Sequence, residues 1–249
     1  MPETSSPWCQ EFIGSLPERA GFARETAVLE AVRGGRTAPI TWVEVRSEHR
    51  GRAATLFVSA DALRVGDEQA SIRINASART TQRIADFFGC VLPTARICNL
   101  IWEQAAVRLS PCIQKPDKQM AYTARMIQHH ESVEKKRAGK EGLIENVGKH
   151  WVLTNRLRGR RDVAANYGWY DPGARHAAGA HRVWQPLGLA HNLDHCDYSQ
   201  VVRLVQRRCL VDGVERDLTE VMVDPALAGL VSDEGALLAA RLPGVPLDG

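Results

Sequence analysis

The chain has 249 residues, of which 44% are apolar, and 32 basic and 29 acidic residues give it a net charge of +3. This length and composition predict a folded chain with one large core or two small ones, and they argue against disorder over most of the sequence. Because the two signs of charge are mixed along the chain, the composition gives no case for a nucleic-acid or acidic-membrane partner.

The first half of the chain is expected to hold several helices and a small antiparallel sheet. Residues 1–8 are expected to form a disordered tail, and a helix is expected over 18–33, before two glycines. Alternating or dense apolar residues predict three strands arranged as an antiparallel meander. These strands are 41–47, 54–60 and 71–75, and the further helices are 78–89, 94–109 and 117–137.

The second half reads as a run of strands over 150–157, 162–170, 182–187, 199–205 and 208–213. The last two are expected to form a hairpin, and Asp212 and Gly213 to open the turn into a short helical tail. Helices followed by antiparallel strands predict an α+β fold. Because no linker divides the sequence, we expect a single domain over 1–249.

The sequence lacks the motifs of several common binding sites and targeting segments. It has no glycine-rich phosphate loop and no apolar run long enough to span a bilayer. The N-terminus lacks the basic and apolar regions of a signal peptide, so a cytoplasmic location is expected. Six cysteines without a CxxC pair argue against a zinc knuckle or a disulfide framework.

The residues best suited to chemistry lie in two places. His191, His195 and Asp197 are close together before the predicted strand 199–205 and can supply a general base with a carboxylate to orient it. Cys90 precedes the helix predicted from position 94, where the partial positive charge of a helix N-terminus favours a thiolate. We therefore predict Cys90 as the nucleophile, His191 as the base and Asp197 as the group that orients His191.

A cysteine before a helix, followed by a histidine before a later strand and a polar residue that orients it, resembles the arrangement of papain-like and NlpC/P60-like cysteine hydrolases. The resemblance implies a papain-like domain and a cysteine-dependent acyl hydrolase or acyltransferase that acts on an amide, peptide or thioester bond. Its expected substrate is a small-molecule, peptide or carrier-bound acyl compound. No cofactor is expected.

A second resemblance, to a bacterial family without an assigned activity, covers most of the chain. The similar phrases are GCVLPTARICNLIW from Gly89, GKHWVLTNRL from Gly148, NYGWY from Asn166, WQPLGLAH from Trp184 and DYSQVVRLV from Asp197. The pattern departs at His150 and His195, which favours His191 as the base. The substrate-binding residues that the resemblance supports are Lys149, Asn155, Trp169, Tyr198 and Ser199.

Two alternatives remain open from the sequence. His191, His195 and Asp197 have the side chains that zinc prefers, although they lack the helical HExxH spacing. A zinc-dependent hydrolase is therefore the second prediction. A non-catalytic binding module with an aromatic-lined cleft is the third, and it is favoured if Cys90 proves to be a buried apolar residue away from His191.

Overall fold

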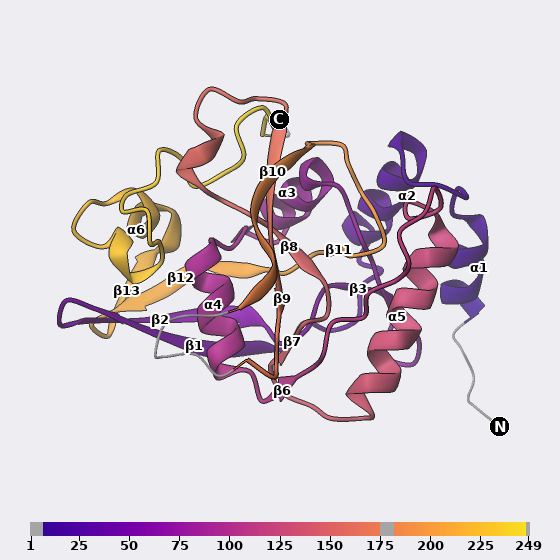
Figure 1. Cartoon of the computed structure of the whole chain (residues 1–249), viewed down its shortest axis with the longest axis horizontal. Helices are drawn as coiled ribbons and strands as arrows, with labels where there is room; N and C mark the ends of the chain where they lie inside the picture. Colours follow the sequence, from indigo (N-terminus) through magenta and orange to yellow (C-terminus); the bar gives the residue numbers. More distant parts are fainter. Residues whose placement is uncertain (1–6, 175–181, 248–249) are drawn as a thin grey trace.

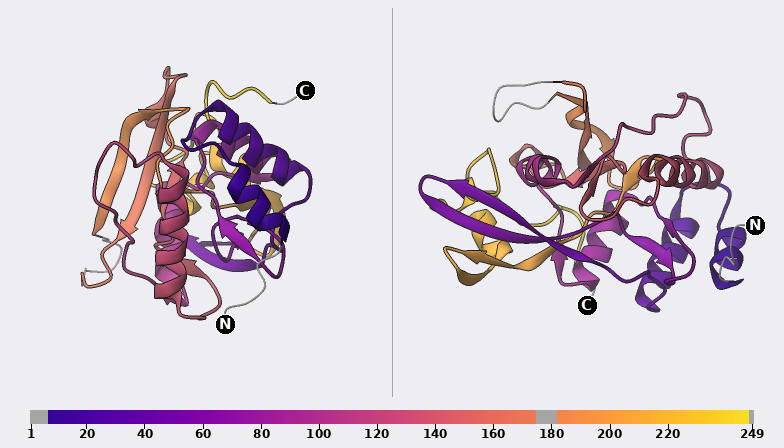
Figure 2. Two further views of the ribbon diagram at one scale, coloured as in Figure 1. Left: turned by 90° about the vertical axis from the view of Figure 1, so that its right-hand side faces the viewer. Right: turned by 90° about the horizontal axis from the view of Figure 1, so that it is seen from below.

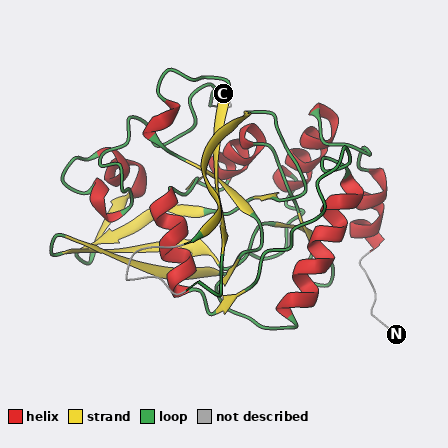
Figure 3. Cartoon of the chain, viewed as in Figure 1, coloured by secondary structure: helices red, strands yellow, loops and turns green. Residues whose placement is uncertain are grey.

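The computed structural model describes residues 7–174 and 182–247. It has the α+β class that the sequence predicts, with helices packed around antiparallel sheets (Figure 3). Most buried apolar side chains belong to one continuous core cluster that draws residues from both halves of the chain. None of the helices in the described part combines the length and the apolar composition that a bilayer crossing needs.

The larger sheet is built on a long hairpin, which extends to the left in Figure 1. Its strands β1 (Trp42–His49) and β2 (Arg52–Ser59) are joined at Arg50 and Gly51, whose φ angles of 50° and 78° are those of a two-residue hairpin turn. Beside β2 lie β12 (Val205–Val211) and then β13 (Val214–Asp217). Strand β5 (Cys90–Val91) pairs with the start of β12.

The second sheet runs through the middle of the molecule (Figure 1). Its strands are, in spatial order, β10 (Val183–Asn192), β9 (Val163–Tyr170), β8 (Lys149–Val152) and β11 (Gln200–Val201). Only β11 pairs in parallel, with β8. Two small sheets complete the described strands: β3 (Arg64–Gly66) with β4 (Ser71–Arg73), and β6 (Val107–Arg108) with β7 (Ile144–Glu145).

The helices lie around these sheets. Helices α1, α2 and α5 gather on one side of the molecule and α6 on the other (Figures 1 and 2). Ser77 and Thr94 cap α3 and α4 by accepting the backbone N–H three residues later, which fixes where these helices begin. The bounds are α1 Pro7–Ser15, α2 Phe22–Arg33, α3 Ala78–Phe87, α4 Ala95–Gln104, α5 Thr123–Arg137 and α6 Leu218–Val223, with short 3₁₀ helices at Asn155–Leu157 and Ala228–Leu230.

Helix α4 packs between the two large sheets, against β1 and β9. Its Trp102 stacks on Tyr170 with ring centroids 4.8 Å apart. Its Asn99 Oδ1 accepts hydrogen bonds from the hydroxyls of Tyr167 (2.9 Å) and Tyr170 (2.8 Å). One face of β9 is thereby covered by α4, and the opposite face of the same sheet is left for other side chains.

A buried ionic cluster joins the sheets. Arg203 donates to the backbone oxygens of Ser59 (2.6 Å) and Ile144 (2.7 Å) and to Glu145 Oε2 (3.0 Å). The other oxygen of Glu145 lies 2.9 Å from His150 Nε2, at the start of β8. Burial alone would raise the pKa of Glu145, but the charges of His150 and Arg203 outweigh it and lower that pKa.

Three helix predictions need correction. The helix expected over 94–109 ends at Gln104, because Val107–Arg108 form strand β6 beside β7. Pro7 and Trp8 belong to helix α1 instead of a disordered tail, while residues 1–6 lie outside the described part. Helix α5 begins at Thr123 and not near Asp117. The Asp117 carboxylate accepts the backbone N–H of Gln119 two residues on, so it closes a turn before the helix and does not cap the helix itself.

Two strand pairings were also predicted wrongly. Segments 199–205 and 208–213 do not form a hairpin, because the first contributes β11 beside β8 and the second belongs to β12. Asp212 and Gly213, with φ angles of 51° and 80°, instead form the two-residue turn that joins β12 to β13. The predicted antiparallel meander is wrong at its third strand, because β4 pairs with β3 and not with β2.

The stability of the fold in acid should depend on two adjacent histidines of α5. Burial and the charge of Arg73 lower the pKa of His129 to about 4, and burial and the charge of Arg64 lower the pKa of His130 to about 3. In the unfolded chain both imidazoles take up protons near their ordinary pKa of ~6.5. Below that pH the unfolded state holds more protons than the folded state, so the free energy of unfolding should fall by up to ~1.4 kcal/mol per pH unit for each histidine.

Urea unfolding at about pH 7, 6 and 5 measures this slope. The variant His129→Phe keeps an aromatic ring against Tyr198, which lies 5.4 Å away between centroids, but it cannot titrate. We expect a shallower dependence on pH for this variant than for the parent chain. Equal slopes for the two proteins would contradict the assignment to His129.

Candidate functional site

One face of the central sheet carries polar side chains from three strands. In the pairing of β8 with β9, Lys149 lies opposite Gly168 and Trp151 opposite Asn166. Directly paired residues of an antiparallel sheet point to the same face. In the pairing of β9 with β10, His191 lies opposite Ala164, two residues before Asn166, so it belongs to this face as well.

Strand β9 is irregular next to Lys149. Tyr167 and Tyr170 both reach Asn99, although residues three apart in a regular strand point to opposite faces. The alternation is broken by Gly168 and Trp169, whose φ angles are 133° and 57°. A positive φ at a tryptophan costs on the order of 1–3 kcal/mol and is a common sign of a functional position. This backbone conformation places the Trp169 ring beside Lys149, whose Nζ lies 5.1 Å from the ring centroid.

The carboxylate of Asp197 lies at the edge of this face and is held in place from several sides. Its Oδ1 accepts hydrogen bonds from the Ser199 backbone N–H (2.7 Å) and hydroxyl (2.5 Å), and its Oδ2 lies 3.6 Å from Lys149 Nζ. Burial would raise the pKa of Asp197, but His195, Lys149 and the Ser199 donors outweigh burial and lower it. Asp197 is therefore an ionised, buried carboxylate at neutral pH.

His195, and not His191, lies next to this carboxylate. Its Nε2 is 3.7 Å from Asp197 Oδ2, slightly longer than a hydrogen bond, and this nitrogen has no hydrogen-bond partner among the described residues. The His191 ring stacks on the His195 ring, with centroids 3.9 Å apart and planes within 8°, and Trp151 packs edge-on against His191 at 6.0 Å. Burial, with the charges of His195 and Lys149, lowers the pKa of His191 to about 4.

This arrangement can perform acid–base chemistry. A carboxylate beside Nε2 favours the imidazole tautomer that carries its proton on Nε2, so the Nδ1 of His195 is left as a proton acceptor. The side chain of His195 is 35% exposed, which leaves it accessible, whereas that of Asp197 is 7% exposed. Neutral His191 packs against one face of the ring and restricts its orientation.

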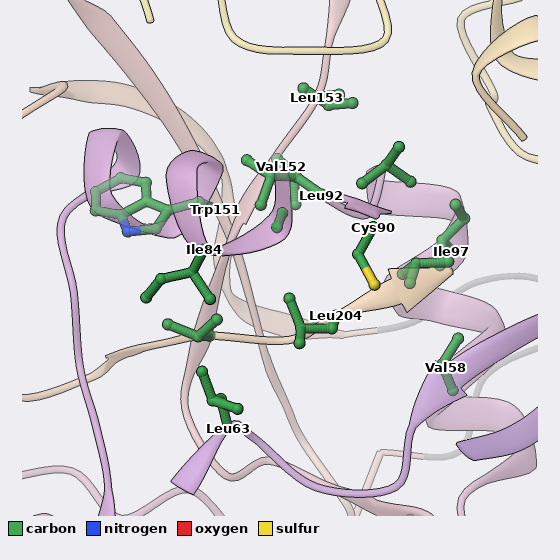
Figure 4. Packing of buried hydrophobic residues seen from close by; sticks show 14 of the residues in the cluster. Val58, Leu63, Ile84, Cys90, Leu92, Ile97, Trp151, Val152, Leu153 and Leu204 are labelled. Atoms are coloured by element: carbon green, nitrogen blue, oxygen red, sulfur yellow. The ribbon is translucent and has the colours of Figure 1, made fainter. Parts of the chain in front are cut away.

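Cys90 does not match the predicted nucleophile. It lies in the hydrophobic core with Leu92, Ile97 and Leu204 around it, on β5 of the other large sheet (Figure 4). Burial raises the pKa of its thiol to about 12, the opposite of the thiolate expected at a helix N-terminus. Helix α4 begins at Ala95, five residues after Cys90, and the Thr94 hydroxyl caps the Ile97 N–H of its first turn.

The five predicted substrate-binding residues divide into two groups. Lys149 and Trp169 lie at the site, and Ser199 lies there as a fully buried donor to Asp197. Asn155 does not, because its side chain is engaged by the backbone of Ala236 and Leu238 in the C-terminal segment. Tyr198 is buried, its hydroxyl accepts the Gln114 N–H at 2.9 Å, and its ring centroid lies 6.3 Å from that of Trp169.

The zinc alternative fails on ring geometry. A metal ion bound by an imidazole nitrogen lies near the plane of that ring, but His191 and His195 form two nearly parallel planes 3.9 Å apart between centroids. A single ion cannot lie in both planes. Consistently, no group of three histidine, cysteine, aspartate or glutamate side chains in the described residues is arranged to hold a metal.

Two residues of the site escaped the sequence analysis as functional candidates. The sequence places Asn166 and Trp151 in strands and assigns neither a functional role, and only the cross-strand register brings them beside Lys149 and His191. The sequence signal that could have found the site is Asn166, a polar residue in a strand that is otherwise apolar or aromatic. In the structure Asn166 is 1% exposed. A buried amide in such a strand indicates either a hydrogen-bond network or a ligand.

Comparisons of the chain with family models, with curated proteins and with solved structures found no match.

We expect His191 to stay neutral from about pH 8 down to about pH 5, because its pKa is lowered to about 4. Titration of the histidine ring signals by NMR, with His191→Phe to assign its resonance, measures this directly. In urea-unfolded protein the pKa of the same ring should be ~6.5. A native His191 that gains a proton near neutral pH would contradict the proposed packing of two stacked rings.

Alkylation tests the position of Cys90. With a pKa of about 12, its thiolate fraction at neutral pH is on the order of 10⁻⁵. We expect iodoacetamide to label Cys90 no faster than the other cysteines in native protein, because all six are buried. Rapid labelling of all six after unfolding is the control. Selective, fast labelling of Cys90 would restore it as a nucleophile.

Proposed function

We propose that the chain is an acyl hydrolase that uses His195 as general base and Asp197 as its partner, with water as the nucleophile. The observation that carries this proposal is the partly exposed His195 imidazole beside a buried carboxylate that stays ionised. Cys90 has no part in the chemistry, because its thiol is buried in the core.

In this mechanism His195 Nδ1 accepts a proton from a water molecule as the water oxygen attacks the acyl carbon. The Asp197 carboxylate stabilises the imidazolium that forms. The tetrahedral intermediate then collapses, the bond from the acyl carbon to the leaving group breaks, and His195 returns the proton to the departing nitrogen or oxygen. A carboxylic acid and an amine or alcohol are released, and both residues regain their original charge.

His191 is a positioning residue in this proposal. Its ring keeps the stacked His195 ring in one orientation and is itself held by Trp151. Because burial and nearby charge keep His191 neutral, it adds no second positive charge beside the imidazolium of His195. A protonated His191 would oppose that charge and weaken the base.

An amide or peptide bond stays the preferred target, as the sequence suggested, and transfer to an acceptor other than water stays a variant of the same chemistry. The papain-like relationship and a cytoplasmic location also stay predictions. None of them is needed for the His195 and Asp197 chemistry, which depends on the loop after β10 and on the polar sheet face.

The substitution His195→Gln tests the proposal. It removes the proton acceptor while retaining a polar side chain of similar reach. We expect kcat to fall by roughly 10²- to 10⁴-fold, the usual contribution of a general base. Activity is followed as release of primary amine from a panel of N-acyl amino acids and dipeptides.

Cys90→Ala is the control and should keep its kcat, since Cys90 is enclosed in the core. Its small cavity can lower the thermal midpoint without changing the rate of the folded protein. Loss of turnover in Cys90→Ala with His195→Gln still active would overturn the proposal, and so would a wild-type protein that hydrolyses no member of the panel.

A further inference from the structure

We propose that a cavity beside helix α5 binds a small organic molecule that carries a phosphate monoester. The cavity lies between one face of α5 and the segment 111–115, which has no regular secondary structure, and its volume is about 440 Å³. Small-molecule sites are typically ~300–1,000 Å³ in size. None of its lining residues belongs to the His195 site, so this inference does not depend on the proposed hydrolysis.

Basic and neutral side chains line this cavity. Those from α5 recur every three or four residues, which places them on one face of the helix. The lining residues are Arg125, Gln128, Ser132 and Lys136 of α5, and Pro111, Cys112, Ile113, Gln114 and Lys115 of the facing segment. Among the described residues that form the cavity wall, none is acidic.

Lys136 holds a positive charge in a fixed position at this cavity. Its Nζ donates to the backbone oxygens of Ser110 (2.9 Å) and Pro111 (2.8 Å) and to Ser110 Oγ (2.9 Å). These acceptors are neutral, and Lys136 forms no ion pair within the part of the chain that the structure describes. Its charge is therefore not compensated. That charge also opposes the rise in pKa that burial causes at neighbouring Cys112.

Lys115 and Gln128 bring donors that are not in use. The exposed Lys115 ammonium makes no hydrogen bond or ion pair with the described residues. Gln128 Oε1 accepts from Arg125 Nη1 at 3.2 Å, so the Nε2 of Gln128 is the end that remains for a ligand. A ligand in this cavity therefore meets N–H donors and has to supply acceptors.

The charge balance selects a dianion. Arg125 donates to the Asp117 carboxylate, which compensates its charge, whereas the charges of Lys115 and Lys136 have no carboxylate beside them among the described residues. Two positive charges are thus left at the cavity. A carboxylate would compensate one of them, and a phosphate monoester, with a charge of roughly −2 at neutral pH, compensates both.

The apolar part of the wall indicates the rest of the ligand. Ile113 lines the cavity beside Pro111 and is 53% exposed. An apolar group placed against Ile113 removes both surfaces from water, which favours binding. Inorganic phosphate would leave this wall exposed. The ligand is therefore expected to join its phosphate to an apolar group such as an aromatic ring.

Calorimetry with the full chain, at fixed ionic strength and about pH 8, tests the preference for charge. Phenyl phosphate is a dianion at this pH, because its second pKa is near ~6, and phenyl sulfate is a monoanion of similar shape. We expect phenyl phosphate to bind about tenfold or more tightly than phenyl sulfate. It should also bind more tightly than inorganic phosphate, because only the ester reaches Ile113.

Lys115→Met should weaken binding of phenyl phosphate by about tenfold, because it removes one of the two uncompensated charges and disturbs no described contact. Lys140→Met is the matched control: it removes an exposed charge from the loop after α5, outside the cavity wall, and should bind as the parent does. Ile113→Ser should weaken binding of phenyl phosphate and leave the affinity for inorganic phosphate unchanged.

Lys136→Met should also weaken binding, but it can displace the segment at Ser110 and Pro111, so the Lys115 variant decides the test. Equal affinities for phenyl phosphate and phenyl sulfate, or no binding of either, would overturn the phosphate assignment. Unchanged binding in Lys115→Met would overturn the site, and so would an equal loss in Lys140→Met, which would indicate a general effect of net charge.

Discussion

The arrangement of the site depends on the buried pairing of Arg203 with Glu145. Arg203 reaches the end of β2 through Ser59 and the start of β8 through Glu145 and His150, so one guanidinium connects both large sheets. Removing one member of such a pair leaves the other charge buried and costs ~3–5 kcal/mol. His150 and Lys149 are neighbours on β8 and point to opposite faces, so the cluster that holds His150 also places Lys149.

The polar face of the sheet carries a local conformational cost. Trp169 has a positive φ, and buried donors of Trp169 and Asn166 lack acceptors in the described residues. The hydrogen bonds from Tyr167 and Tyr170 to Asn99, and the stacking of Trp102, hold the strand on both sides of the irregular pair. A rigid surrounding structure is what allows strained and unsatisfied groups to persist, and such groups concentrate at functional sites.

The two stacked histidines have different surroundings, which the sequence could not distinguish. Both imidazoles lie near Asp197, but only His195 presents a ring nitrogen to it, while His191 lies within β10 and is held by Trp151. Two rings in parallel planes suit one base and one support better than a metal site. In the same loop the Ser199 hydroxyl donates to Asp197 and is fully buried.

The sequence by itself determined the α+β class, most of the strands, the starts of helices α3 and α4, and the region of the candidate site around Asp197, because periodicity and clustered polar residues are local properties. It could not decide the role of Cys90, because position before a helix does not reveal whether a side chain points into the core. It also could not decide between His191 and His195, or find Asn166 and Trp151. Those choices depend on the register of β8, β9 and β10 and on the parallel pairing of β11 with β8. Register is set by long-range packing, and a shift of one residue would turn Lys149 from the polar face to the face that His150 occupies.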